Sequence, residues 1–228
     1  LTKSIFGTIG WIHVHVHIIN EGNIDHKVLR EFTQQHKFTY TWEDVNNDFY
    51  VNLRKDKHRM REGMSIFKTA DMDYIARRTY LASVRFMRLN QLFKNADTHI
   101  LQIDCDSVLR NGFHQSKFRD LTKYVGVMPK PKDPAVFIAS ALTLGLGPNG
   151  MQFRDLFAIR LIEGFEKGCY WYIDQDVLKN VIREWKVDFN LPYIEIPYKW
   201  NAWGIKKDDI FSTGKGNKKN DVKYKAAQ

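Results

Sequence analysis

Two aspartates that follow a short apolar run constrain this chain more than any other feature. The run covers residues 99–103, and Asp104 and Asp106 come directly after it with one residue between them. A short apolar run with β-branched residues is typical of a buried strand. In an open α/β sheet, ligands bind outside the carboxyl ends of the strands. The sequence therefore predicts that both carboxylates lie at the functional edge of a sheet.

Asp104 and Asp106 are suited to binding a divalent cation. Side chains two residues apart in a regular strand point to the same face, and a turn that begins at Asp104 would also bring both carboxylates to one ion. Two hard oxygen ligands at this spacing suit Mn²⁺ or Mg²⁺, with substrate phosphates completing the coordination. A simple turn at the strand end is the alternative, because Asp favours turns and helix caps.

The composition limits the class of protein and the kinds of partner. The chain has 228 residues, of which 43% are hydrophobic, so one large domain or two small ones with a sizeable core are expected. A formal net charge of +9 attracts polyanions, which include nucleic acids, anionic membranes and phosphorylated substrates. Two cysteines make no disulfide framework and favour a reduced, cytoplasmic setting. No apolar run approaches the roughly 20 residues that cross a membrane.

Periodic patterns along the chain predict strands that alternate with helices. Strands are expected at residues 11–18, 38–42, 99–103, 124–128, 135–144 and 191–197, and helices at residues 25–35, 74–93, 153–164 and 171–185. This alternation predicts an α/β fold with a mixed, mostly parallel sheet that is flanked by helices.

Two further segments allow both a functional and a structural interpretation. His13, His15 and His17 share one face of the first expected strand, and three imidazoles in a row could bind zinc. No carboxylate or cysteine is placed with them, so a polar or helix-covered strand face is the other interpretation. Residues 54–61 are strongly basic without an apolar stripe, which fits either a solvated face or a lid over an anionic substrate.

Four segments together resemble the metal-dependent glycosyltransferases of the GT-A fold, in particular the glycogenin and galactosyltransferase-like members. The segments are residues 80–86, 103–109, 172–180 and 196–201, and their order and spacing carry the likeness. The resemblance implies transfer of a sugar from a nucleotide-diphosphate donor, expected to be a UDP-sugar, to a glycan or protein acceptor. It also implies a single domain over residues 1–228, in which the lysine-rich residues 199–228 close on the diphosphate.

The same resemblance assigns roles to individual residues. Asp104 and Asp106 are the expected metal ligands, with Asp106 the more direct of the two. The expected donor-binding residues are Arg85, Asp104, Asp106, Ser140, Lys215 and Gly216. The residues expected to face the sugar or to take part in catalysis are Asp174, Gln175 and Asp176. A divalent cation and Lys215 would together neutralise the charge that develops on the leaving diphosphate.

Two features depart from the pattern of this family. Its members use a C-terminal histidine as a further metal ligand, whereas this chain has Ser212 and Thr213 in the corresponding segment. The family also begins with a strand that holds the nucleobase, followed by a helix, and residues 1–6 resemble the end of that helix. We therefore expect a further strand before residue 1, and weak nucleotide binding without it.

Two other functions fit parts of the sequence. Residues 103–109 also fit the motif of haloacid-dehalogenase-type phosphatases, with Asp104 as the nucleophile, although that motif normally ends the first strand of its domain. A basic nucleic-acid-binding module fits the charge and the aromatic residues, but the lysines gather near the C-terminus without a recognised binding motif. The expected partners are therefore a nucleotide sugar and an acceptor, not nucleic acid, and no transmembrane segment is expected.

Overall fold

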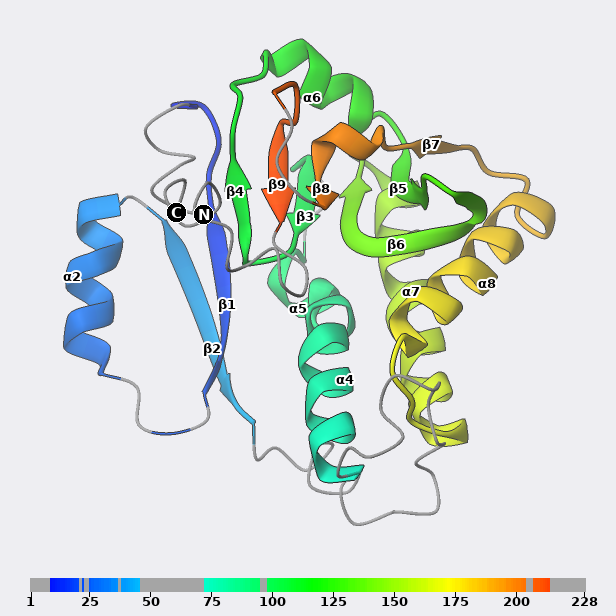
Figure 1. Cartoon of the computed structure of the whole chain (residues 1–228), viewed down its shortest axis with the longest axis horizontal. Coiled ribbons are helices and arrows are strands. Elements are labelled where there is room, and N and C mark those ends of the chain that lie inside the picture. The colour runs from blue at the N-terminus through cyan, green and yellow to red at the C-terminus, as the bar shows by residue number, and fades with distance from the viewer. Residues whose placement is uncertain are drawn as a thin grey trace.

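The computed structural model describes residues 9–20, 22, 25–36, 38–45, 72–94, 98–203 and 207–213. Its strands are β1 (His15–Asn20), β2 (Thr39–Asp44), β3 (Ile100–Ile103), β4 (Ser107–Leu109), β5 (Val125–Lys130), β6 (Asp133–Leu144), β7 (Tyr193–Glu195), β8 (Ala202–Trp203) and β9 (Phe211–Thr213). Its helices are α2 (His26–His36), α4 (Met72–Met87), α5 (Leu89–Leu92), α6 (Gln115–Leu121), α7 (Pro148–Lys167), α8 (Ile173–Val187) and the 3-10 turn η3 (Tyr198–Trp200). The chain is thus a mixed α/β protein (Figure 1).

The strands that the structure describes form three sheets. One pairs β1 with β2, a second has the order β3-β6-β5-β7, and a third has the order β4-β9-β8. Three of the six strand pairings are parallel and three are antiparallel, so the prediction of a mostly parallel sheet is wrong. The main reason is the β5–β6 hairpin, in which Lys130 pairs with Asp133 and only two residues turn the chain. Such a tight turn gives an antiparallel partner, whereas a parallel partner needs a long crossover.

The longer elements follow the predicted periodicity, and the differences lie at their ends and at one interruption. The helices expected at 25–35, 153–164 and 171–185 are present as α2, α7 and α8. The helix expected at 74–93 is interrupted at Arg88, where α4 gives way to the short α5. The first strand begins only at His15. Strands β4, β8 and β9 have three residues or fewer, which is too short for a two-residue periodicity to be recognised in the sequence.

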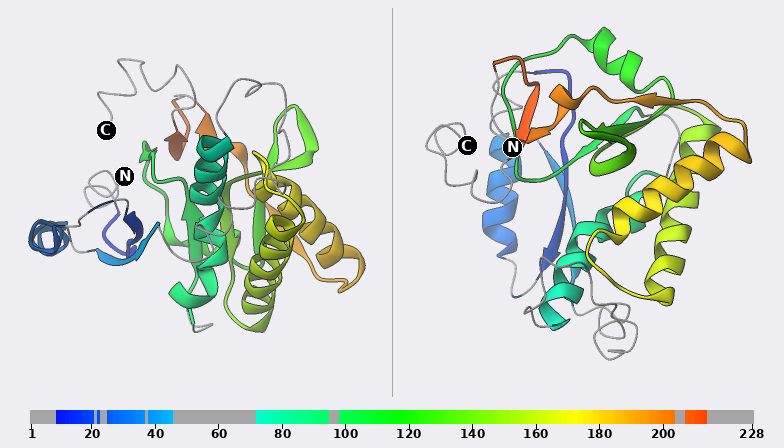
Figure 2. Two further views of the ribbon diagram at one scale, coloured as in Figure 1. Left: turned by 90° about the horizontal axis from the view of Figure 1, so that it is seen from below. Right: turned by 45° about the vertical axis from the view of Figure 1, so that its right-hand side comes forward.

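Two apolar cores lie on opposite faces of the four-stranded sheet. Successive residues of a strand point to opposite faces, and they divide accordingly. Val127 and Leu142 belong to the core that β5 and β6 share with α4, α7 and α8. Met128 and Ala141 belong to the other core, which also contains Trp200 of η3. The helices α4, α7 and α8 lie together in both views of the ribbon, so they form one layer over the sheet (Figure 2).

The β1–β2 pair and α2 lie to one side of this body, with α2 outermost (Figure 2). Residues just before β1 attach it to the second core through aromatic contacts. The ring of Trp11 lies edge-on to Phe113 and to Phe118, with centroid distances of 5.8 and 5.5 Å. Val14 is buried in the same core. The described residues form no strand pairing between β1 and β3.

Candidate functional site

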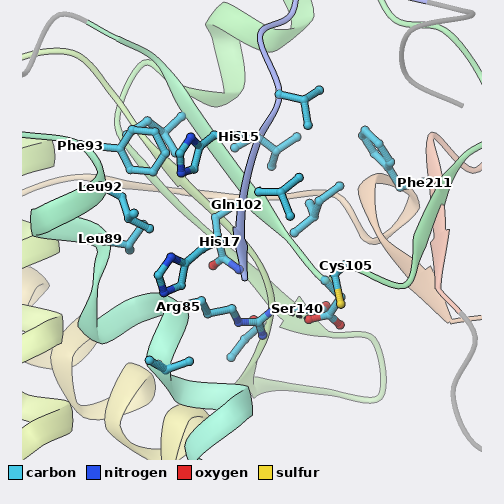
Figure 3. A pocket seen from close by; sticks show the side chains of 18 of the residues that line it. His15, His17, Arg85, Leu89, Leu92, Phe93, Gln102, Cys105, Ser140 and Phe211 are labelled. Carbon is cyan, nitrogen blue, oxygen red and sulfur yellow. Dashed lines mark hydrogen bonds and ion pairs between the residues drawn. The ribbon is translucent and has the colours of Figure 1, made fainter. Parts of the chain in front are cut away.

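A guanidinium holds the carboxylate of Asp104 at the carboxyl end of β3. Arg85, near the end of α4, donates from Nη1 to Asp104 Oδ1 and from Nη2 to the carbonyl oxygen of Ala139 at 2.7 Å. The side chains of Arg85 and Asp104 are only 23% and 16% exposed, so solvent and salt screen this ion pair weakly. Arg85 therefore turns into the site and away from solvent (Figure 3).

An irregularity in β6 supplies the carbonyl oxygens around these side chains. Between two consecutive residues of β5 the register shifts, so that residues 139–141 of β6 have no partners in β5. The carbonyl oxygen of Ala139 accepts the hydrogen bond from Arg85. The carbonyl of Ser140 accepts hydrogen bonds from the backbone N–H of Asp104 at 3.2 Å and from Asn201 Nδ2 at 2.8 Å. Bulges commonly redirect backbone groups next to functional sites, and this one connects β6 to the aspartate turn.

The C-terminal segment fixes the turn that carries Asp106. Ser107 Oγ donates to Asn201 Oδ1 at 2.9 Å, and both residues are fully buried. Strand β9 pairs with β4, and Thr213 Oγ1 at its end donates to Asp106 Oδ1 at 2.8 Å. The sequence places Asn201 in a segment that carries the resemblance and Thr213 where the family has a metal-binding histidine, but it does not predict their contacts with this turn. Asn201 is a polar residue between two apolar ones, Trp200 and Ala202, and that pattern is the signal that could have identified it.

One cavity of about 1430 Å³ brings together most of the predicted site residues that the structure describes. Its lining includes Arg85, Asp104, Asp106, Ser140, Asp174 and Gln175. These residues come from α4, the β3–β4 turn, β6 and the first turn of α8. The cavity therefore joins four segments that are far apart in the sequence.

The remaining predicted residues are placed elsewhere or lie outside the described part of the chain. Asp176 is exposed, is not among the residues that line the cavity, and accepts a hydrogen bond from the hydroxyl of Tyr170 at 2.9 Å. Lys215, Gly216 and the basic residues 54–61 lie outside the described residues, as do residues 1–6.

The hydroxyl of Ser140 is a candidate for ligand contact. Ser140 is 2% exposed and lines the cavity, and its Oγ has no hydrogen-bond partner among the described residues. Buried hydroxyl groups nearly always have a partner. A ligand with a polar group next to Arg85 and Asp104 would provide one.

Asp104 and Asp106 could supply two carboxylate ligands to a divalent cation. In the described part of the chain, no group of three or more His, Cys, Asp or Glu side chains could hold a metal. Two carboxylates leave most positions of a six-coordinate ion to substrate phosphates and water, which is the usual arrangement for Mg²⁺ at phosphate sites. A cation at Asp104 would share that carboxylate with the guanidinium of Arg85.

The pKa of the Cys105 thiol depends on the charges of the two aspartates that flank it. Desolvation raises the pKa of its thiol, and the negative charges of Asp106 and then Asp104 raise that pKa further. The other thiol, Cys169, is fully buried, and burial raises its pKa to about 12. Alkylation near neutral pH is therefore expected to occur at Cys105.

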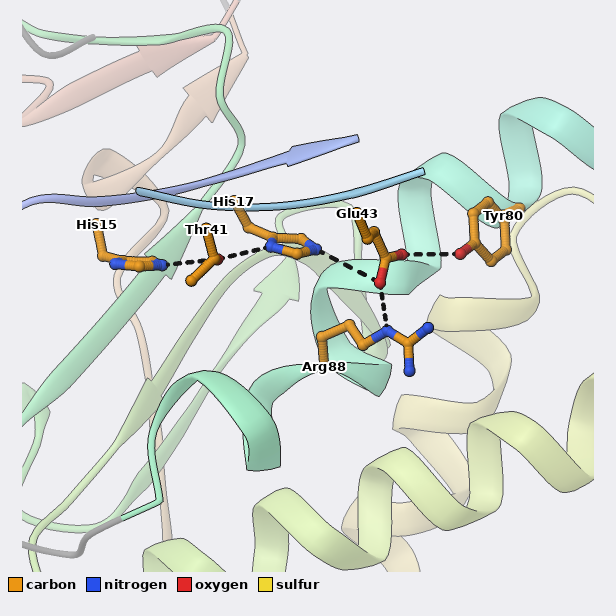
Figure 4. Close-up of polar contacts among 6 residues, drawn as sticks. All are labelled: His15, His17, Thr41, Glu43, Tyr80 and Arg88. Carbon is orange, nitrogen blue, oxygen red and sulfur yellow. Dashed lines mark hydrogen bonds and ion pairs between the residues drawn. The ribbon is translucent and has the colours of Figure 1, made fainter. Parts of the chain in front are cut away.

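A ladder of histidine and threonine side chains joins β1 to β2 on the cavity side. Thr39 Oγ1 lies 2.8 Å from both His13 Nε2 and His15 Nδ1. Thr41 Oγ1 lies 3.0 Å from His15 Nε2 and 2.8 Å from His17 Nδ1 (Figure 4). A hydroxyl donates one hydrogen bond and accepts others. When the imidazole rings are neutral, every hydrogen bond of the ladder can therefore form, with all donors pointing the same way along it. The ladder favours the polar strand face over the zinc site, because threonine hydroxyls already occupy most of the ring nitrogens.

The ladder ends at Glu43, which ties β2 to α4. Glu43 Oε1 accepts from the hydroxyl of Tyr80 at 2.9 Å, and Glu43 Oε2 accepts from Arg88 Nε at 2.7 Å (Figure 4). His17 Nε2 lies 3.9 Å from Glu43 Oε2. Desolvation lowers the pKa of His17, with a further lowering from Arg88 that opposes the raising effect of Glu43. Desolvation, and then the two neighbouring histidines, lower the pKa of His15.

A scan against models of known protein families finds no match, and a search of curated proteins finds none either. None of the helices that the structure describes is long and apolar enough to cross a membrane.

Replacing Arg85 by Met should destabilise the protein by about 1–3 kcal/mol, because it leaves a half-buried carboxylate without its charged donor. Arg85→Met combined with Asp104→Asn should recover part of this loss, since the charge is then absent. Urea denaturation measures the free energy of unfolding, with Arg119→Met on the exposed face of α6 as the control. Additive effects of the two substitutions would contradict the proposed coupling.

Replacing Asp106 by Asn should lower the thiol pKa of Cys105, because one of the two flanking negative charges is removed. The pH dependence of the iodoacetamide reaction measures this pKa. Asp120→Asn, on the exposed side of α6, is the matched control. An unchanged thiol pKa in Asp106→Asn would show that the carboxylate does not act on Cys105.

Acid should destabilise the protein through the histidine ladder. The pKa values of His15 and His17 are lowered in the folded state, so the unfolded chain binds more protons as the pH falls below the ordinary histidine value. This stability is complete above pH ~6.5 and is lost as the pH falls through the folded-state pKa values. The double variant His15→Gln/His17→Gln should lose less unfolding free energy between pH ~7.5 and ~5.5 than the parent. His26→Gln, at an exposed position of α2, should behave like the parent, and equal acid sensitivity in all three proteins would contradict the assignment.

Proposed function

We propose that this chain is a metal-dependent glycosyltransferase domain with a GT-A-like arrangement. It would transfer a sugar from a nucleotide-diphosphate donor, a UDP-sugar in the first instance, to a glycan or protein acceptor. The observation that supports this most is the single cavity that gathers the residues expected to bind the donor. Arg85, Asp104, Asp106, Ser140 and Gln175 all line it, although they come from four separate segments.

The carboxylates and the guanidinium have complementary tasks in this chemistry. Breaking the bond between the sugar and the diphosphate leaves negative charge on the departing phosphate oxygens. A bound Mn²⁺ or Mg²⁺ ion would neutralise that charge as it develops. Asp104 and Asp106 would hold the ion, and Arg85 keeps Asp104 oriented through its hydrogen bonds to the carboxylate and to the carbonyl of Ala139.

The sugar end of the proposed site is formed by β6 and α8. Ser140 offers a buried hydroxyl that can donate to or accept from a sugar hydroxyl. Gln175 lines the same cavity and offers an amide with both donors and an acceptor. Asp174 is buried, and its Oδ1 accepts the backbone N–H of Gln175 at 2.9 Å, which fixes the start of α8. Since Asp176 does not line the cavity, we assign it no contact with the sugar.

Asp104→Ala and Asp106→Ala should each weaken Mn²⁺-dependent binding of UDP about 10- to 150-fold, because each removes a charged ligand of the ion. Calorimetric titrations at millimolar UDP, with and without Mn²⁺, measure the affinity, and circular dichroism checks the fold. Asp120→Ala on α6 should bind like the parent. Unchanged Mn²⁺-dependent affinity in both site variants would contradict the proposal. Hydrolysis of a phosphomonoester that is lost in Asp104→Ala would favour the phosphatase instead.

A further inference from the structure

Two consecutive aromatic residues, Trp171 and Tyr172, lie just before α8 and belong to neither of the two apolar cores that the described residues form. Both side chains are half-buried and line the 1430 Å³ cavity. Their ring centroids are 5.3 Å apart, and the ring planes are inclined by 53°. Aromatic side chains that line a cavity without filling a core are typical of ligand contact. This aromatic pair is therefore a candidate binding surface.

The guanidinium of Arg78 fixes the position of Trp171. Its central carbon lies 5.0 Å from the ring of Trp171 and 5.4 Å from the ring centroid of Tyr74. Arg78 Nη1 also donates to the hydroxyl of Tyr74 at 2.8 Å. Cation–π contacts of this kind are attractive, and these two tie the segment before α8 to α4. The indole is thus held in place before a ligand arrives, which lowers the entropic cost of binding.

The backbone of Tyr172 allows the two rings to meet. Its φ of 75° and ψ of 11° lie in the left-handed region, which is rare for a bulky side chain. In an extended chain successive side chains point to opposite faces, so the rings of neighbouring residues would lie apart. Strained backbone of this kind is concentrated at functional sites. The conformation therefore brings both rings to the same cavity at the expense of local stability.

The aromatic pair lies beyond the residues proposed to hold the donor. Arg78 and Arg85 both line the cavity from α4 and are two helical turns apart, which corresponds to about 10 Å along the helix axis. Arg85 contacts Asp104, whereas Arg78 contacts Trp171. A molecule bound at the aromatic pair would thus lie next to a donor held at the carboxylates, in the position of an acceptor.

The polar groups beside the aromatic pair suit a saccharide. Asp174 and Gln175 follow the pair in the chain and line the same cavity. A carboxylate accepts hydrogen bonds from several hydroxyls, and an amide both donates and accepts them. The face of an aromatic ring carries negative charge, so it attracts the C–H groups on the apolar face of a sugar ring. The rings and the two polar side chains together match both aspects of a sugar.

We propose that the aromatic pair binds a sugar ring of the acceptor, and that the acceptor is therefore a saccharide. This inference rests on the proposed glycosyl transfer and narrows its acceptor. A nucleobase also stacks on aromatic side chains, but it is planar and stacks best on parallel rings. The inclination of 53° instead forms an open corner, which favours a puckered sugar ring.

An array of oligosaccharides of glucose, galactose, mannose and N-acetylglucosamine, probed with and without UDP and Mn²⁺, tests this proposal. The parent protein should bind at least one of these oligosaccharides. Calorimetric titration with that oligosaccharide should show about five- to tenfold weaker binding by Trp171→Leu, because an aromatic contact is lost. Trp171→Phe should retain most of the affinity. Trp42→Leu, at a position of β2 that is 46% exposed and outside the cavity lining, is the matched control and should bind like the parent.

Mn²⁺-dependent UDP binding is the second measurement, and Trp171→Leu should retain it, which also shows that the variant folds. No oligosaccharide binding by the parent, or equal affinity in Trp171→Leu and the parent, would overturn the saccharide site even with UDP binding intact. Loss of UDP affinity in Trp171→Leu without an effect on oligosaccharides would overturn it too and assign the pair to the nucleobase. Absence of UDP binding by the parent would contradict glycosyl transfer, whereas oligosaccharide binding that depends on Trp171 would still support the saccharide site.

Discussion

The ion pair between Arg85 and Asp104 is the interaction on which the arrangement of this site depends. A carboxylate that is only 16% exposed is costly to bury unless strong donors meet it. Arg85 reaches Asp104 because α4 packs over the sheet and ends beside the carboxyl end of β3. The bulge in β6 releases the carbonyl groups that hold the guanidinium and the aspartate turn. The helix, the irregular strand and the turn therefore act as one unit.

The C-terminal segment completes this unit from the other side. Asn201 connects Ser107 at the start of β4 with the carbonyl of Ser140 in β6, and it is fully buried. Thr213 reaches Asp106 from the end of β9. Residues about a hundred positions apart in the sequence thus fix the end of the aspartate turn at Asp106 and Ser107. The position of a cation between the two carboxylates would depend on these contacts as much as on the aspartates themselves.

The long helices and strands and the position of the two carboxylates can be predicted from the sequence, because both depend on local patterns. Apolar periodicity locates α4, α7 and α8, and the apolar run before Asp104 locates β3. The antiparallel β5–β6 hairpin could not be recognised, since its proline- and lysine-rich turn resembles an ordinary loop. The histidine–threonine ladder depends on the register that pairs His15 with Thr39, which no local signal specifies. The contacts of Asn201 and Thr213 likewise depend on distant segments.

The most direct test of the central claim is an anomalous difference map from a crystal soaked with Mn²⁺ and UDP. We predict one Mn²⁺ peak within about 2.5 Å of carboxylate oxygens of the Asp104–Asp106 turn, with diphosphate oxygens completing its coordination. The uridine diphosphate should lie in the cavity beside Arg85 and Ser140. A Mn²⁺ peak on the histidine face of β1, or UDP bound away from the aspartate turn, would contradict a donor site at these carboxylates.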